Sequence, residues 1–240
     1  MVPPPRRGEV RLHLIPVTAA SVAAAGRAAD VLSAEEHEKA AALRRPVDRD
    51  LYLVAHVGLR RIVAAHLGAA LGEVVLGAAP CPSCGGPHGR PLLPQAPGLH
   101  VSLSHAARLA AVALAADEVG VDVEPCDRPD ADLQGLTSQL HPDERRLVAA
   151  SGDRRAALLR CWVRKEAAMK ARGLGLAEPL DAHSTAWPGD RGVTADGLHV
   201  LDVDAGPAHL GAVAVRAPGG ATPTIVVTTS GSPPGQRAQP

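Results

Sequence analysis

The sequence predicts an α+β fold, and three observations support this expectation. Segments with the apolar spacing of helices and segments with the alternation of strands occur in both halves of the chain. The chain has 240 residues, of which 46% are hydrophobic, enough to bury one large core or two modest ones. It contains no Phe, one Tyr and two Trp, so its core must consist of Leu, Val and Ala.

The first half of the chain opens with a predicted strand at residues 10–15 and a helical stretch at 18–32. Ser33 and Glu36 then have the spacing of a capping box, which starts a short helix that continues through Lys39. A longer amphipathic helix is expected at 47–67, with Arg60 and Arg61 facing outward and an inward face formed by Leu51, Val54, Ala55, Gly58 and Ile62. Short strands follow near residues 100–103 and 110–115.

The second half begins with a strand at 119–125, after a turn at Asp117 and Glu118. A helical segment is expected at 142–172, in which Gly152 is the candidate position for a break. The chain then becomes rich in strands, at 198–203, 210–216 and 224–228. The Gly-, Ser- and Pro-rich end, residues 231–240, is typical of a disordered tail.

One helical face near residue 166 carries two opposite charges. Trp162, Glu166 and Lys170 follow one another at i, i+4 steps in a run of good helix formers, and Gly173 supplies a natural stop. Such a stripe is most often a surface ion pair worth a few tenths of a kcal/mol. A second acidic segment is needed before it indicates chemistry.

The strand at 119–125 supplies that segment. Its alternation places three valines on one face and both Asp122 and Glu124 on the other. Two neighbouring carboxylates repel unless solvent, a basic partner or a divalent cation compensates them, and the simplest alternative is an exposed face of an edge strand. A third carboxylate from Glu166 would complete an oxygen-ligand site of the kind that Mg²⁺ prefers.

These motifs resemble the signature pair of the 4′-phosphopantetheinyl transferase superfamily. Residues 120–124 (Gly-Val-Asp-Val-Glu) precede 162–166 (Trp-Val-Arg-Lys-Glu) and Lys170 by about forty residues. Upstream, residues 89–91 (Gly-Arg-Pro) resemble the family's Gly-Lys-Pro, and residues 101–105 resemble its Ser-x-Ser-His segment. The length suits the broad-specificity, Sfp-like branch.

The resemblance implies an architecture of two similar α/β halves in a pseudo-twofold arrangement. Residues 1–115 would form the N-terminal half, with contacts to the nucleotide of coenzyme A. Residues 116–230 would form the C-terminal half, with the metal and catalytic residues, followed by the tail at 231–240. No self-similarity between the halves is visible in the sequence.

The resemblance also implies an activity. A family member transfers the 4′-phosphopantetheine group of coenzyme A to a serine of an apo acyl, aryl or peptidyl carrier protein, releasing adenosine 3′,5′-bisphosphate. By that likeness Asp122, Glu124 and Glu166 would hold Mg²⁺, while Lys165 and Lys170 would offset charge on the leaving phosphate. Either Glu166 or a metal-bound water would be the base.

Four further positions are implied in coenzyme A binding, beside Lys165 and Lys170. Ser104 and His105 match the family's binding pair, with His105 near the 3′-phosphate, and Arg90 replaces the usual Lys. Adjacent residues on a strand point to opposite faces, which disfavours Ser104 and His105 as a nucleophile and its base. Lys39 matches a basic position near the 3′-phosphate.

Two upstream positions depart from the family pattern. Glu36 and Leu51 stand where relatives often carry basic residues, and the candidates to substitute for them are Arg44, Arg45 and Arg49.

Charge and targeting signals limit the partners. The 25 basic residues balance the 25 acidic ones, which argues against bulk attraction to nucleic acid or membranes. No apolar run approaches a membrane span and none follows the N-terminus as a signal segment, so a cytoplasmic protein is expected. A monomer is also expected. Cys81, Cys84 and His88 have the spacing of half a zinc site; whether they bind zinc stays open.

Two alternatives from other classes remain. A zinc-ribbon or nucleic-acid module would need a second ligand pair and a basic surface. A catalytically silent relative that only docks carrier proteins would not need all five residues of the two motifs. The carrier surface is expected near Trp162, where Leu136, Leu140 and Leu147 either meet a carrier helix or belong to the core; the physiological carrier and its pathway are not indicated.

Overall fold

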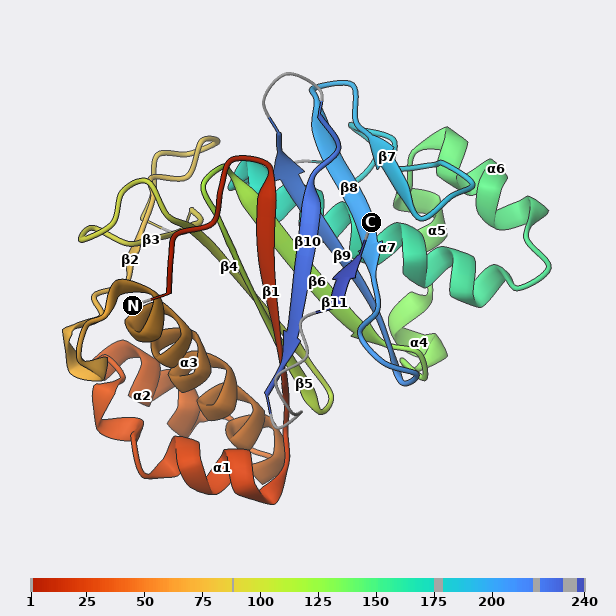
Figure 1. Ribbon diagram of the computed structural model, residues 1–240. Helices are drawn as coiled ribbons and strands as arrows, with labels where there is room; N and C mark the ends of the chain where they lie inside the picture. Colours follow the sequence, from red (N-terminus) through yellow and green to blue (C-terminus); the bar gives the residue numbers. More distant parts are fainter. Residues whose placement is uncertain (1, 88, 175–178, 218–220, 231–236, 240) are drawn as a thin grey trace.

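The computed structural model describes residues 2–87, 89–174, 179–217, 221–230 and 237–239. Its elements lie in four layers: a group of N-terminal helices, a five-stranded sheet, a four-stranded sheet and a layer of helices from the second half (Figure 1). A small two-stranded ribbon, β2 (Gly77–Ala78) with β3 (Pro91–Leu92), stands apart from these layers. The α+β fold class is confirmed.

The five-stranded sheet has the order β11-β10-β1-β5-β4. Its strands are β1 (Glu9–Pro16), β4 (His100–Ala106), β5 (Leu109–Ala115), β10 (Thr224–Thr229) and β11 (Arg237–Gln239). The strands β1 and β10 pair in parallel, and the other neighbours pair antiparallel. The strand β11 occupies part of the segment that the sequence assigns to a disordered tail; residues 231–236 and 240 lie outside the described chain.

The four-stranded sheet is antiparallel and has the order β6-β9-β8-β7. It consists of β6 (Val119–Pro125), β7 (Arg191–Val193), β8 (Leu198–Val203) and β9 (His209–Arg216). The predicted boundary at residue 115/116 separates the two sheets, except that β10 and β11 return to the first one. The pseudo-twofold relation between the halves stays a prediction.

Helices cover the outer faces of both sheets (Figure 1). The first group is α1 (Ala19–Gly26), α2 (Ala34–Ala42) and α3 (Pro46–Leu67), with short 3₁₀ turns at Ala29–Val31 and Leu71–Glu73. The second group is α4 (Asp130–Leu133), α5 (Leu136–Gln139), α6 (Pro142–Ala150) and α7 (Arg154–Arg172). Within the described residues no helix is long and apolar enough to cross a membrane.

Local signals in the sequence explain where these helices begin and end. Ser33 and Glu36 form the predicted capping box of α2, with bonds from Glu36 N–H to Ser33 Oγ (3.2 Å) and from Ser33 N–H to Glu36 Oε2 (2.8 Å). The predicted break near Gly152 is confirmed, because α6 ends at Ala150 and Asp153 caps α7. The stop at Gly173 is also confirmed: its φ of 75° is left-handed, which glycine adopts without strain.

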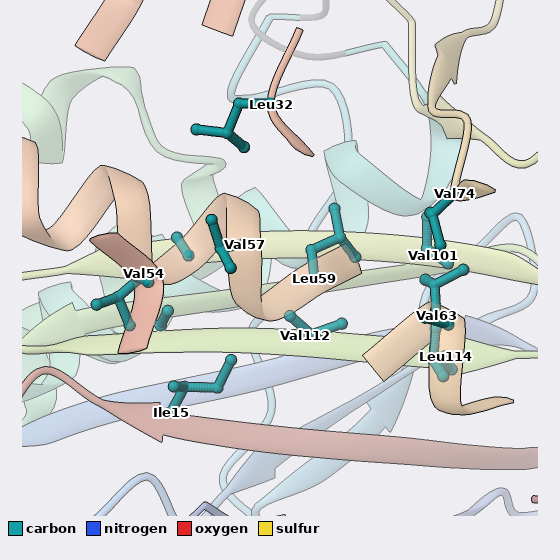
Figure 2. Packing of buried hydrophobic residues seen from close by; sticks show 14 of the residues in the cluster. Ile15, Leu32, Val54, Val57, Leu59, Val63, Val74, Val101, Val112 and Leu114 are labelled. Atoms are coloured by element: carbon teal, nitrogen blue, oxygen red, sulfur yellow. The ribbon is translucent and has the colours of Figure 1, made fainter. Parts of the chain in front are cut away.

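The first core is aliphatic and fills the space between α3 and the five-stranded sheet. Figure 2 shows Val54, Val57, Leu59 and Val63 of α3 with Val112 and Leu114 of β5 in one cluster. Leu51, Val54 and Ala55 are buried as predicted, and Ile62 packs at the edge of the cluster. Burial of this kind contributes about 25 cal/mol per Å² of apolar surface.

The prediction that Arg60 faces solvent is wrong. Only 4% of the residue is exposed, because Arg60 donates to both oxygens of Glu36 on α2, at 2.9 Å and 2.5 Å. Arg61 is exposed as predicted and donates to the Ala24 carbonyl. An ion pair with Glu36, 24 residues earlier in the chain, thus buries Arg60 against the helical pattern.

A second core lies between the two sheets. Val119, Val121 and Val123 of β6 pack there with valines of β9 and with Val10 and Leu12 of β1. The opposite face of the four-stranded sheet packs on Ala167, Ala168 and Ala171 of α7, which allow a short distance between helix and sheet. The predicted alternation along β6 is confirmed, and its carboxylates face the α7 layer.

The edges of the two sheets are joined by serine hydroxyls. Ser102 and Ser104 on β4 accept hydrogen bonds from the backbone N–H groups of Val121 (3.1 Å) and Val123 (3.3 Å) on β6. These amide groups would otherwise be unpaired donors at the edge of a buried strand. The junction places Ser104 directly beside Asp122.

Candidate active site

Gly120 allows β6 to lie against α7 at very short range. A Cβ at this position would overlap the carbonyl oxygen of Ala167 and lie 2.5 Å from the nitrogen of Ala171. Only glycine can occupy such a place without moving the helix. The close approach brings the side chains of Asp122 and Lys170 together.

Asp122 is buried at the meeting point of three elements. Its Oδ1 accepts hydrogen bonds from Ser104 Oγ on β4 (2.8 Å) and from Lys170 Nζ on α7 (2.6 Å). Its Oδ2 is buried and has no hydrogen-bond partner among the described residues. Burial raises the pKa of Asp122 against the opposing effects of Lys170 and Ser104.

Glu124 lies two residues further along the same face of β6. Its Oε1 accepts from Trp162 Nε1 (2.9 Å) and from Arg128 Nη1 (2.5 Å), and the Arg128 guanidinium lies 5.7 Å from the Trp162 ring. Burial and the charge of Asp122 raise the pKa of Glu124, although Trp162 and Arg128 oppose the shift. Trp162 therefore orients a carboxylate of the site.

The third carboxylate, Glu166, comes from α7. Trp162, Glu166 and Lys170 lie on one face of the helix and line one pocket, as the i, i+4 spacing predicts. Burial, Asp122 and Glu124 raise the pKa of Glu166, and Lys170 opposes them. The alternative interpretation, a surface ion pair between Glu166 and Lys170, is wrong, because the Lys170 ammonium pairs with Asp122.

The three carboxylates carry more negative charge than their neighbours compensate. Lys170 and Arg128 supply two positive charges against three carboxylates whose pKa values are all raised. In the described part of the chain, no three His, Cys, Asp or Glu side chains form a ready metal-binding group. The unpartnered Asp122 Oδ2 and the hard oxygen donors nevertheless fit Mg²⁺ in charge and ligand type.

These side chains line an open pocket of about 520 Å³ between β4, β6, α3 and α7. Its lining consists of the acidic residues Asp122, Glu124 and Glu166, together with His56, Pro91, Leu103, Ser104, His105, Val123, Trp162 and Lys170. The acidic group and Lys170 come from the second half, and the two histidines come from the first.

Ser104 and His105 point to opposite faces of β4, as predicted. Ser104 is buried and bonds to Asp122, whereas His105 lies near two rings of α3, 6.3 Å from Tyr52 and 6.2 Å from His56 between ring centroids. The structure therefore gives Ser104 a hydrogen bond that positions a carboxylate. Surrounding protein, His56 and Lys170 lower the pKa of His105 to about 4, so its ring is neutral at pH 7 without an anion.

The structure does not bring Lys165 to this pocket. Its ammonium is buried on another face of α7, where it pairs with Glu144 (3.0 Å) and donates to the His183 carbonyl (2.6 Å). Lys165 is 4% exposed and Glu144 is fully buried. A buried pair of this kind anchors α6 and the 183–185 segment to α7.

Two predicted nucleotide contacts lie outside the pocket lining. Lys39 is exposed on α2 and pairs with Glu35 (2.8 Å). Arg90 pairs with Glu118 (2.7 Å) and donates to the Ala171 carbonyl (3.2 Å), so it lies at the C-terminal end of α7. The next residue, Pro91, does line the pocket.

The positions that depart from the family pattern have structural roles. Glu36 caps α2 and pairs with Arg60, and Leu51 is 8% exposed in the first core. Burial raises the pKa of Glu36, but the hydrogen bonds from His56, Arg60 and Ser33 outweigh it and hold the pKa well below its usual range. Arg45 pairs with Asp48, and Arg49 donates to two carbonyls at the end of α2.

The cysteine loop forms a tight turn beside the β2–β3 ribbon. Cys81 N–H donates to the Gly86 carbonyl (2.7 Å), and Gly86 N–H donates to Cys84 Sγ (3.4 Å). Among the described residues, Cys81, Cys84, Cys126 and Cys161 form no disulfide. His88 lies outside the described residues, so the binding of zinc by Cys81, Cys84 and His88 stays a prediction.

Sequence reasoning missed three residues of the site. His56 and Tyr52 on α3, and Arg128 after β6, approach the predicted residues only in the folded chain. The i, i+4 spacing of Tyr52 and His56 on the amphipathic helix α3 was the available signal. The expected carrier contacts Leu136 and Leu140 are buried among the helices, at 8% and 0% exposure, so they belong to the core.

Comparison with known proteins agrees with the geometry. A family model described as the 4′-phosphopantetheinyl transferase superfamily matches residues 118–199, about one third of the chain. No curated protein matches the chain. The matched segment contains Asp122, Glu124, Lys165, Glu166 and Lys170, so the chain carries an enzyme domain of the 4′-phosphopantetheinyl transferase superfamily at residues 118–199.

Proposed function

We propose that the protein transfers the 4′-phosphopantetheine group of coenzyme A to a serine of an apo acyl or peptidyl carrier protein, and that it belongs to the broad-specificity branch of the superfamily. The observation that carries the proposal is the group of three carboxylates and Lys170 in one pocket, within the matched domain. The reaction requires charge compensation at a pyrophosphate and transfer of a proton from the serine.

The first requirement is charge compensation at a pyrophosphate. Asp122, Glu124 and Glu166 would hold Mg²⁺, whose charge would offset that of the pyrophosphate oxygens and of the leaving group. The raised pKa values and the unpartnered Oδ2 of Asp122 support this role. Ser104 and Trp162 keep two of the carboxylates in place through single hydrogen bonds.

The second requirement is proton transfer. The carrier serine oxygen forms a bond to the β-phosphorus of coenzyme A while the bond to adenosine 3′,5′-bisphosphate breaks. Glu166, which lines the pocket, or a water bound to the metal would accept the serine proton. Lys170, partly exposed in the pocket, offsets the charge that develops on the departing phosphate.

A separate groove supports the carrier assignment. It has a volume of about 440 Å³ between α4, α6 and α7, with Leu133, Val148 and Leu158 in its apolar part and with Arg145, Arg154 and Arg155 beside them. None of the described residues that line the groove is acidic. We propose that it receives an acidic amphipathic helix of the carrier.

The groove is connected to the site by one residue. Arg155 donates a hydrogen bond to the carbonyl of Arg128, and Arg128 pairs with Glu124. A carrier bound at this groove would therefore lie on the side of the pocket that contains Glu124.

The direct test incubates the protein with coenzyme A, Mg²⁺ and an apo-carrier and weighs the carrier by mass spectrometry. The expected result is a carrier heavier by one phosphopantetheine group, with loss of the reaction in excess EDTA. A carrier that stays apo while it still binds the protein would identify a catalytically silent docking protein. Undiminished transfer in EDTA would contradict the metal assignment.

A further inference from the structure

A second histidine belongs to the same pocket as His105. His56 on α3 lines the pocket, and its ring centroid lies 6.2 Å from that of His105 on β4. Tyr52, one turn earlier on α3, stacks on His56 with centroids 4.0 Å apart and an interplanar angle of 22°. The stacking restricts the His56 ring to one plane.

Glu36 fixes the tautomer of His56. The Nδ1 atom of His56 lies 2.9 Å from Glu36 Oε1, and a carboxylate at that distance requires a proton on Nδ1. Among the described residues, Nε2 has no hydrogen-bond partner. The ring of His56 thus presents one unused nitrogen while its other nitrogen is held.

The charge of Glu36 does not repel an anion at this place. Arg60 binds both oxygens of Glu36, at 2.9 Å and 2.5 Å, and both side chains are largely buried. The pair is neutral as a unit, so Glu36 can orient His56 without adding net negative charge to the pocket. Lys170 adds a positive charge on the opposite side, close enough to lower the pKa of His105.

We propose that His56 and His105 bind one phosphate group of the nucleotide substrate between them, with Glu36 and Arg60 as positioning residues for His56. The inference rests on the proposed function and extends it, since the likeness to the family implicates His105 and Lys39 at the 3′-phosphate but not His56. An N–H of each ring would donate a charge-assisted hydrogen bond to the phosphate oxygens. His56 would then take over a contact that relatives make with basic residues at positions 36 and 51, where this chain has Glu36 and Leu51.

The test measures binding of coenzyme A and of 3′-dephospho-coenzyme A by calorimetry, without a carrier. His56→Ala should weaken coenzyme A binding about 10-fold or more, the loss typical of a charge-assisted hydrogen bond. The loss should shrink for the dephosphorylated ligand. His37→Ala, on the exposed surface of α2, is the matched control and should bind like the parent.

A double variant decides whether the two rings share one phosphate. The losses from His56→Ala and His105→Ala should not add in the double variant, because each ring acts on the same group. His56→Gln, which keeps a side-chain donor, replaces His56→Ala if melting shows that the latter is unfolded. In transfer assays the KM for coenzyme A should rise while kcat at saturation is retained.

The outcomes separate the two proposals. A parent protein that binds neither ligand overturns the proposed function and this subsite with it. A parent that binds coenzyme A, with His56 variants that match it or lose both ligands equally, overturns the shared phosphate site alone.

Discussion

The burial of Asp122 costs folding free energy but prepares a carboxylate for binding a cation. It is buried, two donors share its Oδ1, and its Oδ2 has no partner among the described residues. An unpartnered buried carboxylate oxygen costs free energy, which is the reason that burial raises the pKa of this group. A site that binds a cation recovers this cost when it is loaded.

Glu166 offers the sharpest test at the scale of one residue. Glu166→Gln keeps the shape of the side chain but removes its charge, so turnover should fall about 10²-fold or more if the carboxylate is a ligand or base. The raised pKa shows that the charged form is disfavoured on folding. The melting temperature without Mg²⁺ should therefore hold or rise, as measured by thermal unfolding beside the transfer assay.

Measuring both turnover and melting temperature on Glu166→Gln distinguishes a loss of catalysis from a loss of folding. A variant that transfers at the parent rate would remove Glu166 from the mechanism. A variant that loses both activity and melting temperature would show that the carboxylate is structural.

His13 is expected to make the folded protein less stable in acid. Burial, Arg11 and His66 lower its pKa from 6.5 to about 4, so the folded chain holds the ring neutral. Its contribution to stability is complete above pH 6.5 and is lost as the pH falls from 6.5 towards about 4. His13→Gln should reduce the drop in melting temperature between about pH 7.5 and about pH 5 by a few degrees.

His37→Gln is the control for this measurement, because His37 is exposed on α2. A drop in melting temperature that is the same in the parent and in His13→Gln would assign the acid sensitivity to other groups.

At the scale of elements, the spacing between β6 and α7 sets the geometry of the site. Gly120→Ala places a methyl group against the backbone of Ala167 and Ala171, which cannot move as a side chain would. We expect α7 to shift, with a loss of stability of about 1–3 kcal/mol and a fall in turnover beyond it. Gly26→Ala is the control, since a Cβ there meets nothing within 4 Å.

Denaturant unfolding and transfer assays on both glycine variants check this expectation. If Gly120→Ala retained parent stability and activity, the short distance between β6 and α7 would not be needed.

Lys165 lies on another face of α7 than its neighbour Glu166, so we expect its replacement to affect stability and not turnover. Lys165→Met leaves Glu144 buried without its cation, and breaking such a pair costs about 3–5 kcal/mol. The expected result is a lower melting temperature with near-parent turnover at low temperature, where the variant is folded. Turnover that falls about 10²-fold in the folded variant would restore the role implied by the family likeness.

The elements of the site could be predicted from the sequence because their signals are local. Two-residue alternation located Asp122 and Glu124 on one face, and i, i+4 spacing located Trp162, Glu166 and Lys170 on another. The burial of Arg60 and the approach of His56 depend on partners 20 or more residues away, so no local pattern reveals them. Leu136 and Leu140 show that helical spacing alone does not separate core from docking surface.

At the scale of the whole molecule, the site lies where the two sheets meet. The serines of β4 pair with the edge of β6, and β10 crosses back to pair in parallel with β1 of the first sheet. Figure 1 shows these strands side by side between the two groups of helices. The histidines and the carboxylates therefore belong to one pocket although they come from opposite halves of the chain.

The groove between α4, α6 and α7 gives a prediction for the complex of the protein with its carrier. Arg145 and Arg154 are exposed beside the apolar floor of the groove, on α6 and at the start of α7. Arg145→Glu and Arg154→Glu should each raise the KM for the carrier about 5-fold to 50-fold, because like charges now face an acidic helix. Coenzyme A binding should not change, since neither residue lines the pocket. Added salt should weaken the parent interaction more than that of the variants.

The control for the groove is Arg146→Glu, a change of the same charge on the same helix. Arg146 pairs with Asp143 and does not line the groove, so its replacement should leave the KM for the carrier near the parent value. Steady-state assays with a varied apo-carrier concentration give the comparison. If all three variants raised this KM equally, the effect would come from net charge and not from the groove. A specific effect at Arg145 and Arg154 would instead place the carrier helix beside Arg155, one contact away from Arg128 and Glu124.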